Sequence, residues 1–208
     1  SNFQFLISKQ KLKIIEGDIL KFDETTIKTS YRIIANIPYY LTGALIQKFL
    51  LSNNKPTEMI LMVQKEVGER IAAQPPKANL LSSLTQFLAE SEILFKVGKE
   101  NFWPQPKVDS VLIKLIPKHV NIRERSRIAT WSPRDFTSFD IVNIDSYIEF
   151  LKAVFRQPRQ TLFNNLRKSG LIKAEQLEKL FLDENFPKNI RPQNLDREKL
   201  IQLFSLLE

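Results

Sequence analysis

Short apolar runs alternate with helically spaced apolar residues over the first 117 residues of the chain. Five segments are rich in β-branched residues and bounded by turn residues, and they predict strands at 11–18, 31–38, 57–64, 92–98 and 108–117. Helical spacing of apolar residues predicts helices at 41–52, 65–74 and 79–91. The alternation predicts an α/β fold. The nearly continuous apolar strands predict a largely parallel sheet that is buried on both faces.

The pattern changes after Pro117. Residues 118–144 are polar, charged and weakly periodic, which indicates a long connection. Apolar residues then return at helical spacing, with Gly170 placed to end one helix and Pro158 expected to begin or kink another. The sequence therefore predicts an α/β domain over residues 1–117, a polar connection over 118–144 and a small all-helical domain over 145–208.

Composition narrows the class of partner. The 208 residues include 31 Lys and Arg against 23 Asp and Glu, which gives a net charge of +8 and favours a polyanion such as nucleic acid. A basic protein without such a partner is an equally compatible interpretation. The absence of cysteine favours the reducing cytoplasm and excludes thiolate metal sites, and the single histidine, His119, argues against a metal centre. No apolar run approaches a membrane span, so we expect no membrane partner. We also expect a monomer.

Two polar side chains stand at the ends of predicted strands. Asp18 ends the first strand, and Asn36 ends the apolar run of the second. Ligands of open α/β sheets bind beyond the carboxyl ends of strands, where a carboxylate and an amide can meet one amine-bearing molecule. Pro38 restricts the turn that follows, and the ring of Tyr39 can lie flat against a base or a cation. The alternative is a strand-ending turn in which Asn36 bonds only to nearby backbone.

Six segments, in this order, resemble the motifs of one family. They are EGDILKFD (16–23), NIPYY (36–40), MVQKEVGERI (62–71), FWPQPKVDSVLIKL (102–115), FRQPRQTLFNNL (155–166) and IRPQNLDREKLIQLF (190–204). Together they are similar to the small-subunit ribosomal RNA adenine dimethyltransferases, with the erythromycin-resistance methylases as near neighbours. The segments QKEVGERI and PKVDS favour the former. The resemblance implies an incomplete Rossmann-like methyltransferase sheet followed by a small helical domain that binds ribosomal RNA.

The resemblance also implies a site for methyl transfer from S-adenosylmethionine to adenine amines of ribosomal RNA in the small subunit. Asn36 and a carbonyl of the Ile37–Pro38 turn would accept the hydrogens of the adenine amine. Tyr39 would stack on the target base or face the sulfonium of the donor. These roles need no general base, because the proton can leave to water after the transfer.

Two further groups of residues complete the implied site. Asp18 and Ile19 would hold the adenine of the cofactor, and Asn36 would also touch the reactive end of the cofactor. Phe102 would stack on the target base. Phe102 and Trp103 are alternatively an aromatic plug over a core. Five basic residues are candidates for RNA phosphates: Lys107, Arg156, Arg159, Arg167 and Lys168. A solvated surface is the alternative for them, and Lys107 with Asp109 can instead pin a loop to the following strand.

One departure from the family pattern affects the cofactor. The chain has five glycines, none spaced as the family's G-x-G-x-G loop, and it lacks the acidic residue that follows the second strand of the family. We expect an amino-terminal truncation, with an internal deletion as the alternative. The chain by itself is then expected to bind structured RNA in a salt-sensitive way but to bind S-adenosylmethionine poorly. Two other hypotheses are a non-catalytic RNA-binding or ribosome-assembly factor and a transcription factor of the same family.

Overall fold

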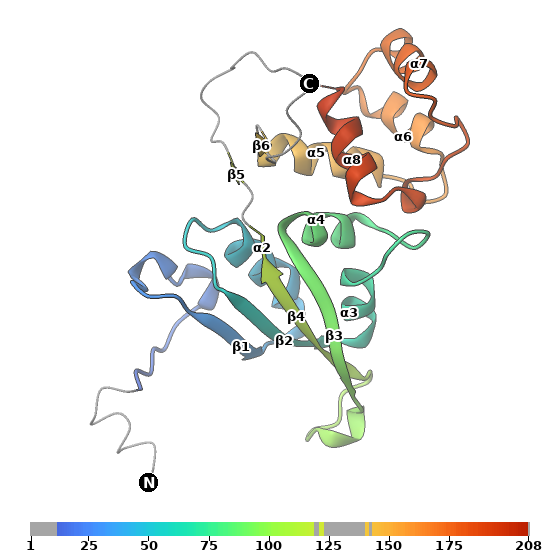
Figure 1. Cartoon of the computed structure of the whole chain (residues 1–208). Helices are drawn as coiled ribbons and strands as arrows, with labels where there is room; N and C mark the ends of the chain where they lie inside the picture. Colours follow the sequence, from blue (N-terminus) through green and yellow to red (C-terminus); the bar gives the residue numbers. More distant parts are fainter. Residues whose placement is uncertain (1–11, 119–120, 123–139, 142, 208) are drawn as a thin grey trace.

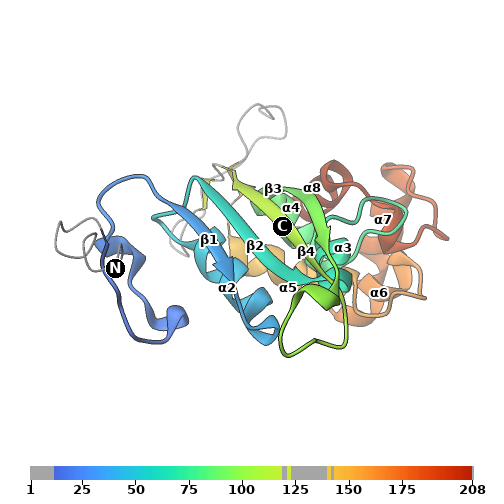
Figure 2. The same cartoon turned by 90° about the horizontal axis from the view of Figure 1, so that it is seen from below.

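The computed structural model describes residues 12–118, 121–122, 140–141 and 143–207. A four-stranded sheet lies beside three helices, and a second group of helices lies beyond them (Figures 1 and 2). The α/β fold with a helical carboxyl-terminal part therefore agrees with the prediction. Most of the predicted connection, residues 118–144, is outside the described residues. Within its described part, β5 (Asn121–Ile122) and β6 (Asp140–Ile141) form a short parallel pair.

The sheet has the strand order β1-β2-β4-β3. Strand β1 (Arg32–Asn36) runs parallel to β2 (Glu58–Gln64), whereas β4 (Ser110–Pro117) is antiparallel to both β2 and β3 (Ala89–Val97). The prediction of a largely parallel sheet is thus wrong for the described strands. The reason is that residues 98–109 return the chain directly from β3 to β4 without a crossover helix, which makes the two strands antiparallel.

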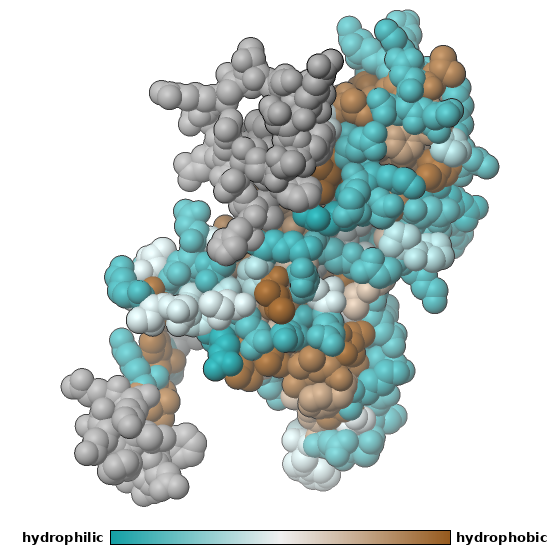
Figure 3. All heavy atoms as spheres, in the orientation of Figure 1, coloured by the Kyte–Doolittle hydropathy of each residue, from teal (hydrophilic) through white to brown (hydrophobic). Residues whose placement is uncertain are grey.

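One face of the sheet is buried and the other is not. On β2, buried Met59, Leu61 and Val63 alternate with half-buried residues. Ile34 of β1 is 75% exposed, and Figure 3 shows hydrophobic residues at the surface over the strands. Burial on both faces was therefore a wrong prediction for the described residues, because their helices pack against one face only (Figures 1 and 2).

The predicted strand at 11–18 is also wrong over its described part, residues 12–18. These residues belong to no helix or strand, and Ile14 and Ile15 are 74% and 58% exposed. A strand needs a neighbour for its backbone hydrogen bonds, and no described strand pairs with this segment. Asp18 instead caps a 3-10 turn, η1 (Ile19–Lys21), which precedes a second turn, η2 (Glu24–Thr26).

The three helices beside the sheet confirm the helical pattern. They are α2 (Thr42–Leu51), α3 (Lys65–Ile71) and α4 (Leu80–Leu88). Asn79 begins α4 through a capping box with Ser82, and the helix ends earlier than predicted because β3 already starts at Ala89. Gly68 on α3 lies so close to Val111 of β4 that a side chain there would clash with it, which allows close packing of helix and sheet.

The carboxyl-terminal part contains α5 (Ile144–Val154), α6 (Leu162–Ser169), α7 (Ala174–Asp183) and α8 (Arg197–Ser205). Gly170 follows α6 with φ of 76°, which confirms its predicted role at a helix end. Pro158 neither begins nor kinks a helix, contrary to the prediction. It lies in the turn between α5 and α6, and Thr161 caps α6 instead.

Aromatic rings join the helical part to the sheet layer. Tyr147 and Phe150 of α5 meet Phe87 of α4 and Phe204 of α8, with ring centroids 4.5–5.9 Å apart. Each of the four is at most 6% exposed. We call these four residues the aromatic interface.

Candidate active site

A hollow opens where β1 ends. Its walls come from two segments far apart in the chain, and its lining residues are Asn36, Ile37, Pro38, Tyr39, Phe102, Trp103, Pro104 and Pro106. We call it the strand-end hollow. It brings the NIPYY and FWPQP segments together, as a shared site requires.

The first wall is a fixed turn. Asn36 is the last residue of β1 and pairs with Met62 of the parallel strand β2. Pro38 then leads into the turn η3 (Tyr39–Leu41), in which the Leu41 amide donates to the Pro38 carbonyl over 2.9 Å. The hydroxyls of Tyr39 and Ser110 are 2.8 Å apart, so a hydrogen bond holds the tyrosine against β4. The backbone and one ring of this wall are therefore positioned before any ligand arrives.

The side chain of Asn36 is accessible at this turn, whereas Ile37 is 8% exposed. Asn36 is exposed, and among the described residues its side-chain amide has no hydrogen-bond partner. The alternative interpretation, in which Asn36 bonds to local backbone, therefore finds no support in the described contacts. The Pro38 carbonyl already accepts from Leu41, so the carbonyl of Ile37 is the better candidate for a second acceptor beside Asn36.

The second wall is the connection between β3 and β4. It begins with the turn η4 (Lys99–Asn101), and an oxygen of the Asp109 carboxylate accepts from the Lys99 amide over 3.2 Å. The Asp109 carbonyl accepts from the Lys65 amide over 2.9 Å. Asp109 therefore has a structural role, but it closes the loop and ties it to α3 rather than to the following strand. Lys107 is exposed.

The two aromatic residues of this loop differ. Phe102 is half-buried, but Trp103 is 97% exposed. The interpretation of Trp103 as a plug over a core is thus wrong. Sequence reasoning missed it as a site residue because a tryptophan is more often buried than exposed. The polar and proline residues that surround it were the available signal.

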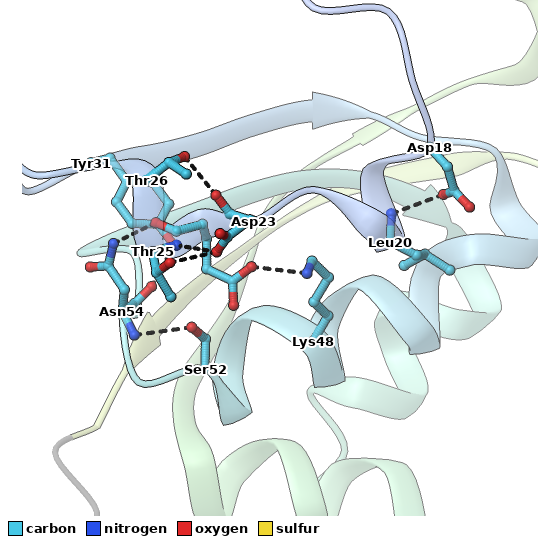
Figure 4. Close-up of polar contacts among 10 residues, drawn as sticks. Asp18, Leu20, Asp23, Thr25, Thr26, Tyr31, Lys48, Ser52 and Asn54 are labelled. Atoms are coloured by element: carbon cyan, nitrogen blue, oxygen red, sulfur yellow. Dashed lines mark hydrogen bonds and ion pairs between the residues drawn. The ribbon is translucent and has the colours of Figure 1, made fainter.

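The other predicted cofactor residues do not line the strand-end hollow. An oxygen of the Asp18 carboxylate accepts from the Leu20 amide over 2.9 Å (Figure 4). Ile19 is 39% exposed. Asp18 thus makes a local cap with one oxygen, while the other has no partner among the described residues. Contacts with α2 and with Asn54 attach this segment to the rest of the fold.

Figure 4 shows that attachment. Lys48 of α2 forms a 2.9 Å ion pair with Glu24, and the Asn54 amide donates to the carbonyl of Glu24 over 2.6 Å. The same amide also donates to the carbonyl of Ile27 over 2.9 Å. Burial raises the pKa of Glu24, but hydrogen bonds from Lys48 and Ser52 outweigh it and leave the pKa below its usual value. Glu24 is thus a charged anchor that fixes residues 18–27 against α2.

The predicted RNA-binding residues gather on the helical part, except for Lys107. Arg156 donates to the carbonyl of Lys168 over 3.3 Å, and Arg167 and Lys168 form the basic last turn of α6. Arg159 is exposed in the turn between α5 and α6. Within the described part of the chain, no acidic side chain forms an ion pair with any of these five residues, so their charges remain available to an anion.

Comparison with known proteins decides the family. A family model described as "Ribosomal RNA adenine dimethylase" matches residues 2–207. The chain belongs to the ribosomal RNA adenine dimethylase family. The resemblance inferred from the sequence motifs is thereby confirmed, and the family is one of methyltransferases that act on ribosomal RNA.

Relatives and solved structures agree with this assignment. "Ribosomal RNA small subunit methyltransferase A" of Mesomycoplasma hyopneumoniae strain J is 34% identical over 196 residues, which are 93% of this chain and 68% of that protein. The Phytoplasma australiense protein of the same name is 36% identical over 184 residues. These residues are 84% of this chain and 59% of the Phytoplasma protein.

Two crystal structures share the fold. One is a dimethyladenosine transferase from Plasmodium falciparum, with a TM-score of 0.73 and 22% identity; the match covers 97% of this chain and 74% of that one. The other is the 23S rRNA methyltransferase ErmE, with a TM-score of 0.66 and 16% identity; the match covers 98% of this chain and 75% of that one. Within the residues that the structure describes, no helix is long and apolar enough to cross a membrane.

Proposed function

We propose that the strand-end hollow is the methyl-transfer site of an S-adenosylmethionine-dependent enzyme that dimethylates adenine amines in small-subunit ribosomal RNA. The observation that carries this proposal is that one hollow joins Asn36 and the Ile37–Pro38 turn to Phe102. Family membership supports it, as do relatives whose names state a small-subunit ribosomal RNA methyltransferase.

The hollow suits the activation of an amine. The lone pair of an adenine amine is delocalised into the ring, which makes the amine a poor nucleophile. The side-chain oxygen of Asn36 and the carbonyl of Ile37 each accept one amine hydrogen, which localises the lone pair on nitrogen and directs it. The donor supplies an electrophilic methyl group when it is bound. The amine nitrogen would take this methyl group from the sulfur of the donor, and the surplus proton on nitrogen would then leave to water.

Aromatic side chains hold the base in this proposal. Phe102 stacks on one face of the target adenine, and Tyr39, fixed by its hydrogen bond to Ser110, flanks the reacting amine. A target adenine must leave its own stack to enter such a site, and stacking on protein rings offsets part of that cost.

The residues present fit part of the donor. The free oxygen of the Asp18 carboxylate can accept from the amine of the donor's adenine, and exposed Ile19 can pack beside that ring. The five glycines of these 208 residues include no spaced glycine loop for the methionine end.

RNA contact is proposed for the exposed basic residues. Arg156, Arg159, Arg167 and Lys168 would bind phosphates beside the α5–α6 turn, and Lys107 would bind one near the hollow. In this proposal residues 1–117 carry the reaction and hold the target base, and residues 145–208 supply most of the phosphate contacts. The connection 118–144 joins the two parts. The small ribosomal subunit is the proposed partner of a cytoplasmic monomer.

The test replaces Asn36 by alanine in the complete gene product. We expect single-turnover methyl transfer to ribosomal RNA to fall by about 10²–10³-fold, because a preorganised acceptor in the transition state contributes roughly 3–4 kcal/mol. RNA binding should stay unchanged, since Asn36 carries no charge for a phosphate. The matched control is Asn53→Ala, an exposed asparagine that does not line the hollow. Equal rates for Asn36→Ala and the parent protein exclude the proposed role.

A further inference from the structure

Trp103 is the most exposed large hydrophobic side chain in the part of the chain that the structure describes, with 97% of its surface open to solvent. It is also one of the residues that line the strand-end hollow. An exposed indole costs free energy through its contact with water, and such a cost at a concave site marks a binding surface rather than a packing residue.

The backbone separates Trp103 from Phe102. Phe102 is extended, with φ of −119° and ψ of 147°, and successive side chains of an extended chain point to opposite sides. The two rings therefore cannot cover the same base. Pro104 and Pro106 restrict the backbone after Trp103, so the loop loses little further conformational freedom when a ligand binds.

We propose that Trp103 stacks on an unpaired nucleotide that flanks the target adenine in the same RNA strand. This inference rests on the proposed function, because Phe102 is taken to hold the target. An indole face binds any base without a hydrogen-bond code, so it can hold the strand in place whatever the neighbouring base is. Lys107 is exposed on the same loop, so in this proposal it binds a phosphate of that strand. Trp103 is thus a positioning residue for the substrate.

The fluorescence of the indole provides a direct test. The chain has two tryptophans, and Trp131→Phe leaves Trp103 as the only one. The complete chain with this change is titrated with a nine-residue oligoriboadenylate while tryptophan emission is recorded. Stacking is expected to quench the emission saturably. Fluorescence anisotropy of the same RNA carrying a fluorescein label measures its affinity independently of tryptophan.

Variants give the quantitative outcome. Trp103→Ala should weaken binding of the oligonucleotide by about 5- to 150-fold, the equivalent of 1–3 kcal/mol for one stacked base. Trp103→Phe should restore most of it, because it keeps an aromatic face. Leu182→Ala is the matched control, since Leu182 is 79% exposed on α7 and does not line the hollow. Bound RNA without quenching, or Trp103→Ala with parental affinity, overturns the inference.

Failure of this inference can be told apart from failure of the proposed function. If Asn36→Ala abolishes methyl transfer while Trp103 is not quenched by bound RNA, the reaction stands and the flanking contact is wrong. If Trp103 is quenched but Asn36→Ala transfers methyl groups at the parental rate, the hollow binds RNA and its catalytic role is wrong. Quenching by the small ribosomal subunit's proteins but not by RNA would also overturn the inference.

Discussion

The strand-end hollow and the aromatic interface both use aromatic rings, but in opposite ways. In the interface, Tyr147 and Phe150 are at most 2% exposed and contact other rings on neighbouring helices. In the hollow, Trp103 is 97% exposed and Tyr39 is held by a single hydroxyl contact with Ser110. Rings that are packed by other rings stabilise the fold, whereas rings that a hydrogen bond or a proline-bounded loop positions remain available to a ligand.

This difference separates the effects of substitutions. Removing a ring from the interface leaves a cavity among side chains that cannot close around it, so the free energy of unfolding falls. Removing a ring from the hollow exposes little new surface, so folding is largely unaffected and only binding or catalysis changes. Measurements of stability and activity on the same variants therefore test whether the two regions are independent.

The largest effect is expected for Phe150→Ala in the interface. We expect the free energy of unfolding to fall by about 3–5 kcal/mol, the usual cost of deleting a fully buried phenyl ring. Urea unfolding followed by circular dichroism measures it. The control is Leu182→Ala, an exposed position where the change should stay within about 0.5 kcal/mol. A loss below about 1 kcal/mol for Phe150→Ala would mean that the interface does not hold the helical part to the sheet layer.

Local signals in the sequence predicted the elements well. Gly170 predicted the end of α6, since glycine acts on its own backbone, whereas the predicted strand 31–38 ran two residues past the end of β1 at Asn36. The pairing of strands did not follow from local signals. Residues 12–18 look like a strand, but they form one only if a neighbour offers hydrogen bonds, and no described strand does.

The site was predictable only in part, for a similar reason. The motifs identified Asn36 and Phe102, and the structure brings both to one hollow. The contact between Tyr39 and Ser110 joins the turn η3 to the start of β4, and the exposure of Trp103 depends on the path of a loop. Both follow from tertiary structure, which periodicity and spacing do not describe.

The second prediction concerns the hollow. Phe102→Leu should raise the RNA concentration needed for half-maximal turnover, by at most the roughly 5- to 150-fold that a stacked base contributes, and should lower the rate modestly. Leucine keeps the apolar bulk but lacks the flat face. Thermal unfolding is measured beside the kinetics of the complete gene product. A lower melting temperature with normal kinetics would instead assign Phe102 to the core, as in the plug interpretation.

The smallest effect concerns a polar group in the interface. Tyr147 is fully buried, and among the described residues its hydroxyl has no hydrogen-bond partner. A buried hydroxyl without a partner costs free energy, so Tyr147→Phe should leave the stability at pH 7 unchanged or raise it by up to about 1 kcal/mol. Urea unfolding measures this difference. A loss of 1 kcal/mol or more would show that the hydroxyl makes a contact that matters.

Alkaline pH should enlarge the difference in the free energy of unfolding between the parent protein and Tyr147→Phe. Burial raises the pKa of Tyr147 well above its usual 10.0, although the positive charge of Arg197 opposes the shift. The folded chain therefore keeps the phenol proton at a pH where the unfolded chain releases it, so the contribution of this group to stability falls as the pH rises above about 10. Tyr147→Phe has no such proton to lose. The ratio of unfolding constants for the two proteins, measured between pH 8 and about 11, should rise in favour of the variant only above pH 10, and a flat ratio would contradict the burial of a protonated phenol.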